Sequence, residues 1–548
     1  MSSTAEAAAK PSPVSAGEPS AAPDPGGLAP FRRPIFRWLW VALLVSTVGS
    51  WMHDTGAGWL MTSLAPDPVM VALVQAAALL PSFLLAVPAG ALADIVDRRR
   101  FLLFAMSWLM VSAGVLGVLT VTGAITAWGL LAMTFAMGTG AAMMMPAFSA
   151  LIPDLVPRSE LPAAVTLNGI AFNVSRAIGP VLAGLLLSAA GPGFVFLINS
   201  ASYLGVLAVL FFSRTPRRQS TLPSERFFGA LRMGLRYARR SAGLQVVIAR
   251  GILYFVLVSA PVAFLPLIVR EEMGAGPEVY GRLLGAVGVG AVLVGLNLAR
   301  LRRYLSDDAL VALGSAGTIA AALALAFVRD AWWLAPAMLL LGASWVSVLS
   351  TLQVVAQLSL PEWVRARGLA VFLASFMGTV AGAAAFWGKI ASLTSLSEAL
   401  VYAAVVGVIG LGLGAPLNMR RYASADPTLV TPIPDPSVPF TIQQDQGPVL
   451  VEIRYEIDPA DADDFAAAMQ PVRKLRLRNG AITWGLFQDT EEERLFVEVF
   501  VDESWLEHLR QHRRLTRGDM EVLAAAFRYH RGEERPRVSH RIARQRRG

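Results

Sequence analysis

The feature that most constrains this chain is a series of twelve long apolar segments. Each approaches or exceeds the roughly 20 residues that a helix needs to cross a hydrocarbon core of about 30 Å. A mean hydropathy of +0.54, with 55% apolar and only 16% charged residues, argues against a soluble fold. We therefore predict an all-α membrane protein with twelve transmembrane helices. The expected spans are 36–63, 69–92, 101–122, 125–146, 162–188, 193–213, 245–269, 279–299, 309–328, 332–354, 368–391 and 396–417.

Basic residues in the short loops predict the orientation of these spans, because Lys and Arg are retained on the cytoplasmic side. Loops on one side carry 22 Lys and Arg, against four on the other. Both termini are therefore expected in the cytoplasm, with the chain in the inner or plasma membrane. The net charge of +8 then reflects topology and contact with the lipid bilayer, so no nucleic-acid partner is predicted.

A polar stretch separates six spans from the other six, and the two sets repeat weakly. Gly90 and Gly295 follow the second and eighth spans, and Pro153 and Pro361 follow the fourth and tenth, at nearly the same offset. Parallel halves of this kind place a transport site near the midplane between them. The predicted organisation is a disordered tail (1–30), an N-terminal half (31–213), a cytoplasmic central loop (214–244), a C-terminal half (245–422), a Pro-rich linker (423–447) and a small cytoplasmic domain (448–548).

The last hundred residues predict a ferredoxin-like α+β domain, called the tail domain below. It is similar to dimeric α+β barrel domains that include small monooxygenases, so dimerisation is a candidate role beside regulation or scaffolding. The expected order is a strand at 449–457, a helix at 461–478, strands at 481–488 and 495–501, helices at 504–512 and 516–528, and a strand at 537–542.

Two histidines of the tail domain are the candidate metal ligands or acid–base pair. His508 and His512 are four residues apart on one helix face, but no third ligand and no His-Glu-x-x-His motif accompany them. A solvated or dimer-contact role is the preferred interpretation, and no metal site is predicted. The chain has no cysteine and no phosphate-binding Gly-x-x-x-x-Gly-Lys-Ser/Thr loop. No cofactor is therefore expected, and an ion gradient remains as the energy source.

Asp54 is the carboxylate placed well inside a span, and an ionisable group there indicates function by default. Thr47, Ser50 and Asp54 form one polar stripe on the first helix. A carboxyl group removed from water favours its neutral form, as proton coupling requires. The alternative is a permanently paired structural acid. His53, beside it, is expected to serve packing and not proton relay.

Arg176 lies in the fifth helix, on a stripe that contains glycine, proline and asparagine. The first hypothesis is that Arg176 neutralises an acidic group, with Asp54 as the candidate, while the flexible stripe lets the helix rock. The alternative is a structural arginine bound to backbone carbonyls. The remaining members of the stripe are Thr166, Gly169, Asn173, Pro180 and Gly184, and Gly179 joins Asn173, Pro180 and Gly184 in the helix-five motif.

Several aromatic, methionine and polar residues are candidates to line an apolar cavity between the halves. They are Ser50, Met137, Met144, Tyr254, Trp345 and Phe376.

The run Gly90-Ala-Leu-Ala-Asp94-Ile-Val-Asp97-Arg98-Arg99-Arg100 resembles the signature loop of the major facilitator superfamily. The resemblance implies that Gly90 permits close helix packing and that Asp94, Arg98 and Arg99 form gating ion pairs. Within that superfamily, the segments at 51–60, 173–180 and 363–368 are similar to those of enterobactin exporters, macrolide-efflux proteins and the transmembrane secretion effectors. Gly179 and Pro180 resemble an antiporter motif.

The resemblance and the residues together favour a secondary transporter and not an enzyme. The leading hypothesis is a proton-coupled exporter of small amphipathic molecules, siderophore-like or macrolide-like, that works by alternating access of a major facilitator fold. An uptake symporter is one alternative. A membrane-tethered enzyme that uses the tail domain for its chemistry is the other.

Overall fold

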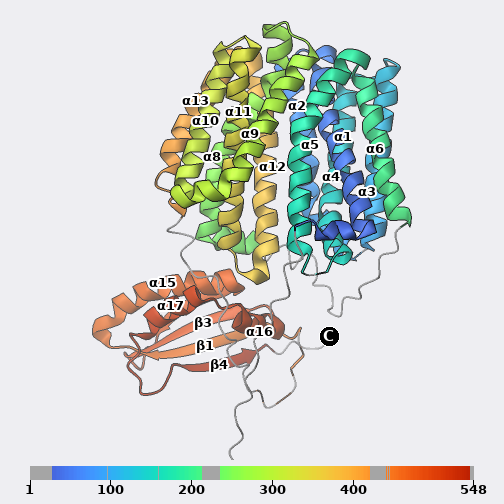
Figure 1. The fold of residues 1–548 in the computed structure, drawn as a ribbon. Coiled ribbons are helices and arrows are strands. Elements are labelled where there is room, and N and C mark those ends of the chain that lie inside the picture. Colours follow the sequence, from blue (N-terminus) through green and yellow to red (C-terminus); the bar gives the residue numbers. More distant parts are fainter. Residues whose placement is uncertain are drawn as a thin grey trace, which may run out of the picture.

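Twelve long apolar helices form the membrane part of the molecule (Figure 1). The computed structural model describes residues 27–543 except 96, 158, 213–234, 420–437, 439, 441 and 444. Within this described part, each predicted span coincides with one helix, so the all-α membrane architecture is confirmed. Most of the expected N-terminal tail, central loop and linker lies outside the described residues.

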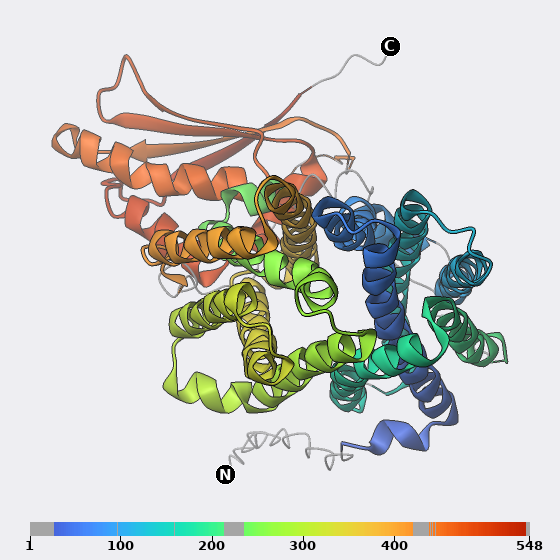
Figure 2. The same cartoon turned by 90° about the horizontal axis from the view of Figure 1, so that it is seen from above.

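The twelve helices divide into two groups of six, which Figure 2 shows side by side. The first half consists of α1 (Pro34–Leu64), α2 (Pro68–Ile95), α3 (Arg98–Val121), α4 (Ala127–Leu155), α5 (Leu161–Ala190) and α6 (Pro192–Phe212). The second consists of α8 (Ala242–Leu267), α9 (Pro277–Tyr304), α10 (Asp307–Phe327), α11 (Ala331–Leu358), α12 (Glu362–Leu393) and α13 (Leu396–Gly414).

Two helices extend well beyond their predicted apolar spans. α4 continues to Leu155, and α12 begins at Glu362, directly after Pro361 in its extended conformation. Hydropathy marks the part of a helix that suits the hydrocarbon core, whereas the helical backbone can continue beyond it, as α4 does through Pro146 and Pro153. Side-chain caps begin two other helices. The Ser306 and Asp330 side chains accept hydrogen bonds from backbone N–H groups in the first turns of α10 and α11.

The two halves pack tightly at the distal end, defined as the end of the membrane part away from the tail domain (Figure 1). On α9, a Cβ added to Gly281 would lie 2.5 Å from the carbonyl oxygen of Pro180 and 2.9 Å from the Cα of Gly184 on α5. On α12, a Cβ at Gly388 would lie 2.8 Å from the Cβ of Ala72 on α2. Because these glycines have no side chain, the backbones of helices from the two halves approach each other closely and close this end.

Toward the tail domain, the facing surfaces of α5 and α9 are no longer buried. Ile170 and Leu296 continue the faces that meet at the distal end, yet they are 48% and 76% exposed. A Cβ at Gly169 would meet nothing within 4 Å. The contact between α5 and α9 is therefore closed at the distal end and open on the tail side.

The tail domain is a four-stranded antiparallel sheet with helices on one face. Its strands are β1 (Val449–Glu456), β2 (Thr483–Gln488), β3 (Leu495–Asp502) and β4 (Arg537–Ile542), in the order β2-β3-β1-β4. The helices α15 (Ala462–Asn479), α16 (Trp505–Arg514) and α17 (Arg517–Phe527) follow the predicted positions within two residues. Side chains from β1 and β3 form the core with Phe465 and Met469 of α15.

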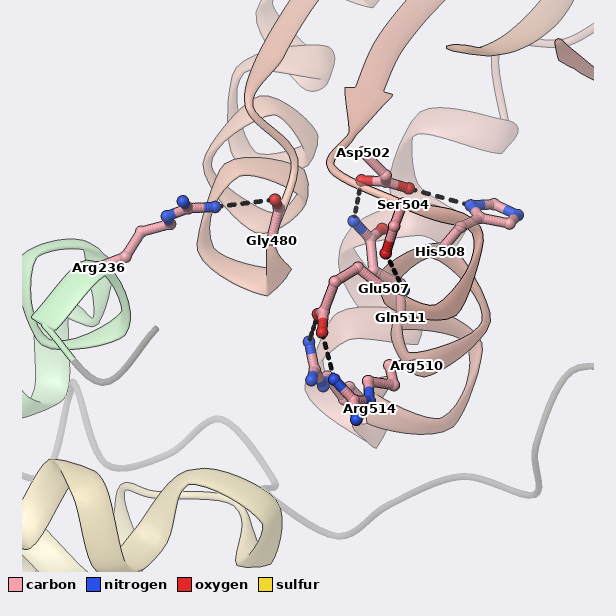
Figure 3. A network of polar contacts seen from close by, with 9 residues as sticks. All are labelled: Arg236, Gly480, Asp502, Ser504, Glu507, His508, Arg510, Gln511 and Arg514. Carbon is pink, nitrogen blue, oxygen red and sulfur yellow. Dashed lines mark hydrogen bonds and ion pairs between the residues drawn. The ribbon is translucent and has the colours of Figure 1, made fainter. Parts of the chain in front are cut away.

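The tail domain docks against the second half through three arginine contacts. Arg236, which precedes α8, donates from Nη1 to the carbonyl oxygen of Gly480 at 2.9 Å (Figure 3). Arg514 of α16 lies 4.5 Å from the ring centroid of Trp363 at the start of α12. The guanidinium of Arg478 lies 5.6 Å from the ring centroid of Tyr237.

Candidate functional site between the two halves

Asp54 lies on the face of α1 that meets the interface between the two six-helix halves, which is called the seam below. Trp51 and Gly58 lie on either side of it on that face; Trp51 contacts Gly179 of α5, and Gly58 contacts Tyr280 of α9. The Asp54 side chain is exposed although its sequence neighbours His53 and Thr55 are buried. No hydrogen bond or ion pair holds its carboxylate among the described residues, so the structure shows none of the contacts of a paired structural acid.

His53 points into the first half and not into the seam. It is 1% exposed, and its ring centroid lies 4.7 Å from that of Phe196 on α6. The ring packs as expected from the sequence, although both ring nitrogens are buried without a hydrogen-bond partner among the described residues.

Arg176 lies between one aromatic ring from each half. Its guanidinium carbon is 5.7 Å from the ring centroid of Trp51 on α1 and 5.5 Å from that of Trp345 on α11. No ion pair joins Arg176 to Asp54 within the part of the chain that the structure describes, so the expected pairing is not seen. The cation is instead stabilised by the faces of two aromatic rings, which attract it electrostatically.

An aromatic cluster of the second half continues this site. Phe255 of α8 packs 4.3 Å from Phe376 of α12, and Trp345 lies 5.9 Å from Phe376, between ring centroids. The seam therefore presents a carboxylate, a guanidinium and several aromatic rings. Such a surface can bind an amphipathic molecule through its apolar part and its polar groups.

Three of the proposed cavity residues contact residues of their own half, and a fourth, Tyr254, is buried in the second half but lies within electrostatic range of Arg176. Met137 is buried in the core of the first half, and Met144 packs against the same core. Ser50 bonds to Ser46 and Tyr203, and Tyr254 is 2% exposed with its hydroxyl 3.2 Å from Thr318 Oγ1. A cavity-lining role for these residues stays a prediction, because hydrophobicity on a transmembrane helix does not separate lining residues from core residues.

The stripe on α5 divides into two functional parts. Gly179, Pro180 and Gly184 are buried, and Gly179 and Gly184 allow close approach to α1 and α9. Asn173 is half-buried and donates from Nδ2 to the carbonyl oxygen of Gly169 at 2.8 Å, within its own helix. The motif thus closes the distal end, with Arg176 at the junction with the open side.

Arg250, the second arginine inside a span, has a different environment. Its guanidinium forms an ion pair with Asp308 of α10 at 2.6 Å and donates to the carbonyl oxygen of Gly414 on α13. It therefore connects three helices of the second half, which is the structural role that Arg176 lacks.

The predicted gating loop is described only in part. Arg99 donates to the carbonyl oxygens of Leu210 and Phe211 at the end of α6, at 2.7 and 2.6 Å, and no ion pair of Arg99 is seen with a carboxylate whose side chain the structure describes. A cation at a helix C-terminus is favourable, so this contact holds α3 against α6. Gly90, Asp94 and Arg98 lie outside the residues whose side-chain surroundings the structure describes.

In the tail domain, the expectation that His508 and His512 have no third partner is wrong. His540 of β4 lies beside them, and one nitrogen from each ring falls within 4.8 Å of the others. The expectation failed because a strand far along the chain supplies the third histidine, and sequence spacing does not reveal that approach.

One residue of the seam was not predicted. Trp51 was noted only within a segment that resembles the family. Arg176 in the middle of α5 could have pointed to such a residue. A guanidinium in a membrane requires partners, and aromatic faces can supply them.

Comparison with known proteins supports the fold. The family profile described as transmembrane secretion effector matches residues 25–548. The chain is 24% identical over 260 residues to the staphyloferrin A transporter of Staphylococcus aureus, covering 47% of this chain and 65% of that protein. It is 23% identical over 279 residues to the macrolide efflux protein A of Streptococcus pyogenes, covering 49% of this chain and 67% of that protein. The chain thus spans about two thirds of the length of these relatives.

Solved structures share the membrane fold at low identity. The nucleoside transporter NupG superposes with a TM-score of 0.60 at 11% identity, over 70% of this chain and 99% of that one. A bacterial homologue of the iron transporter ferroportin, in an inward-facing state, gives 0.54 at 17% identity, over 71% and 99%.

Two six-helix halves that enclose a polar and aromatic seam define a protein of the major facilitator class. Within that class, the profile match over most of the sequence identifies the family. The chain belongs to the transmembrane secretion effectors.

Proposed function

We propose that this chain is a proton-coupled exporter of small amphipathic molecules, siderophore-like or macrolide-like, in the inner or plasma membrane. The observation that carries the proposal is the Asp54 carboxylate at the seam, without a partner among the described residues, together with an Arg176 held between Trp51 and Trp345. The names of the staphyloferrin A transporter and the macrolide efflux protein favour these substrate classes and, for the second, the direction.

The shape of the seam fits the loading step of export. With the tail domain in the cytoplasm, as the loop charges predict, the distal end faces outward. The packing of Gly184 against Gly281 then closes the outside, while the exposed faces of α5 and α9 open to the cytoplasm. A substrate from the cytoplasm enters there and rests its apolar surface on Trp345 and Phe376.

Proton exchange at Asp54 supplies the driving force in this scheme. Asp54 takes up a proton when the seam opens outward, and releases it when the seam opens to the cytoplasm. Each elementary charge moving inward through about 100 mV gains about 2.3 kcal/mol, which biases the rocking of the halves toward export. Arg176 keeps a fixed positive charge beside the seam and attracts acidic groups of the cargo.

The tail domain serves regulation, dimerisation or scaffolding in this proposal. The strand order β2-β3-β1-β4, with α15, α16 and α17 in the crossovers, supports a ferredoxin-like unit. Its position beside α12 gives it contact with the membrane part.

Inverted membrane vesicles test coupling and direction together. With an acidic lumen, vesicles that contain the wild-type chain should accumulate labelled staphyloferrin A or a labelled macrolide, and a protonophore should abolish the accumulation. Asp54→Asn should abolish it as well, because the amide cannot exchange a proton. Asp67→Asn is the matched control, since Asp67 is an exposed residue at the start of α2.

Two outcomes would contradict the proposal. Unchanged accumulation by Asp54→Asn would remove Asp54 from coupling. Accumulation that requires the opposite gradient would indicate an uptake symporter.

A further inference from the structure

Three histidines of the tail domain converge at one point between α16 and β4. His508 and His512 lie one turn apart on α16, and their ring centroids are 4.8 Å apart. His540 projects from β4, and its ring centroid lies 4.7 Å from that of His508. One ring nitrogen from each lies within 4.8 Å of the other two.

The orientation of His508 is set by a buried carboxylate. Asp502, at the end of β3, places Oδ2 3.0 Å from His508 Nδ1, and both side chains are almost completely buried (Figure 3). Because a carboxylate accepts, Nδ1 carries the proton and the lone pair of His508 lies on Nε2. Gln511 donates to the other oxygen of Asp502 and holds it in place. Carboxylates orient metal-binding histidines in this way.

Two ring nitrogens of the cluster lack the partner that burial requires. Within the described part of the chain, His508 Nε2 and His540 Nε2 are both buried without a hydrogen-bond partner. A buried polar atom without a partner costs free energy, so each needs an explanation.

We propose that the tail domain binds one divalent transition-metal ion, Zn²⁺ or a chemically similar ion, through His508, His512 and His540. Imidazole nitrogen suits zinc, copper and nickel, and zinc is commonly held by three histidines with a fourth position left to water. Three nitrogens around one ion lie about 2.0–2.1 Å from it, so small side-chain rotations complete the site. Asp502 is a positioning residue because it acts through His508.

The competing interpretation is a packing cluster without metal. Trp505 lies 5.4 Å from His508 and 6.1 Å from His540, between ring centroids, and the four rings fill one corner of the domain. Packing alone explains the ring contacts. It does not explain two ring nitrogens buried without partners, or a buried carboxylate that sets the tautomer of His508.

The test uses the full-length chain in detergent micelles, purified with an affinity tag that contains no histidine. Equilibrium dialysis against Zn²⁺, with the bound metal measured by mass spectrometry, should give one ion per chain. His512→Ala and His540→Ala should each weaken binding at least tenfold. Asp502→Asn should weaken it about 10- to 100-fold while the stoichiometry is kept. His530→Ala is the matched control, because His530 lies in the same domain but contacts Glu456 and Glu534 instead.

Co²⁺ provides a second measurement on the wild-type chain, which removes any dependence on the folding of variants. The visible spectrum of Co²⁺ bound by three imidazoles with few waters is far stronger than that of the hexahydrated ion. Wild-type chain with the weak spectrum of hydrated Co²⁺ would overturn the proposal. So would Zn²⁺ binding that is equal in the wild type and a His512→Ala/His540→Ala double variant, or that is lost equally in His530→Ala. The test does not depend on transport.

Discussion

At the residue scale, the same substitution should cost different amounts of stability at the two arginines inside the spans. Arg250→Gln leaves Asp308 without its ion pair, and breaking a partly buried pair costs about 3–5 kcal/mol at most. Arg176→Gln breaks no ion pair among the described residues, so its loss of stability should be limited to the cation–π contacts, about 0.5–2 kcal/mol. Tryptophan fluorescence during thermal unfolding measures both variants.

The effects of the same two substitutions on transport should rank in the reverse order. Arg176→Gln should remain folded and lose transport, whereas any Arg250→Gln protein that stays folded should keep it. An Arg176→Gln variant that transports like the wild type would return Arg176 to a structural role.

A second residue-scale prediction concerns the acid stability of the tail domain. Burial alone would raise the pKa of Glu507, but Arg514 and Arg510 on the same helix hold that pKa below its ordinary value. A carboxyl whose folded pKa is depressed contributes stability above its unfolded pKa of about 4.3. This contribution is lost as the pH falls from there through the folded pKa.

The measurement is the melting temperature of the tail domain within the full chain, recorded between neutral pH and about pH 3. Glu507→Gln should lower the melting temperature at pH 7 and approach the wild type in acid, because both side chains are then neutral. Glu491→Gln, at an exposed turn, should follow the wild type throughout. A constant difference between Glu507→Gln and wild type at every pH would contradict the prediction.

At the scale of elements, the contact between α5 and α9 predicts control of the distal gate. Gly281→Leu places a side chain against Pro180 and Gly184, where even a Cβ lies too close to backbone. Overpacking of this kind costs about 1–3 kcal/mol, which changes the ratio of closed to open states about 5- to 150-fold. Gly295→Leu is the matched control on the same helix, because its Cβ meets only Val346 at 3.9 Å.

Spin labels measure the opening directly, since the natural chain contains no cysteine that would compete for label. Ala124→Cys and Lys389→Cys place labels at exposed positions near the distal end of each half. Gly281→Leu should move the distance distribution to longer values, and Gly295→Leu should not. Identical distributions in both variants would show that this glycine contact does not hold the gate.

The elements themselves were predictable because a membrane leaves few options for an apolar segment. Every backbone polar group must be paired within the bilayer, so twelve apolar segments become twelve helices. The same constraint hides the site, since Met137 in the core and Trp345 at the seam look alike in the sequence. Asp54 and Arg176 stood out because charge in lipid is rare, whereas His540 depended on a long-range approach in the tail domain.

At the scale of the whole molecule, arginine side chains join the tail domain to the membrane part. One hydrogen bond from Arg236 to Gly480 and two cation–π contacts, at Trp363 and Tyr237, are among the contacts of the described residues. Each such contact contributes about 0.5–2 kcal/mol. The two six-helix halves have their own buried cores and meet each other directly. We therefore expect the tail domain to be accessory to the membrane fold.

Removal of residues 423–548 tests whether the tail domain is accessory to transport or carries out the chemistry of a membrane-tethered enzyme. A truncated chain should still reach the membrane and accumulate labelled substrate in inverted vesicles, because Asp54, Arg176 and the distal gate all remain. A membrane-tethered enzyme would instead lose its reaction completely. The matched control is full-length Trp363→Ala, which weakens docking without removing the domain. If truncation abolishes transport while Trp363→Ala preserves it, the tail domain itself is required, and the accessory role is wrong.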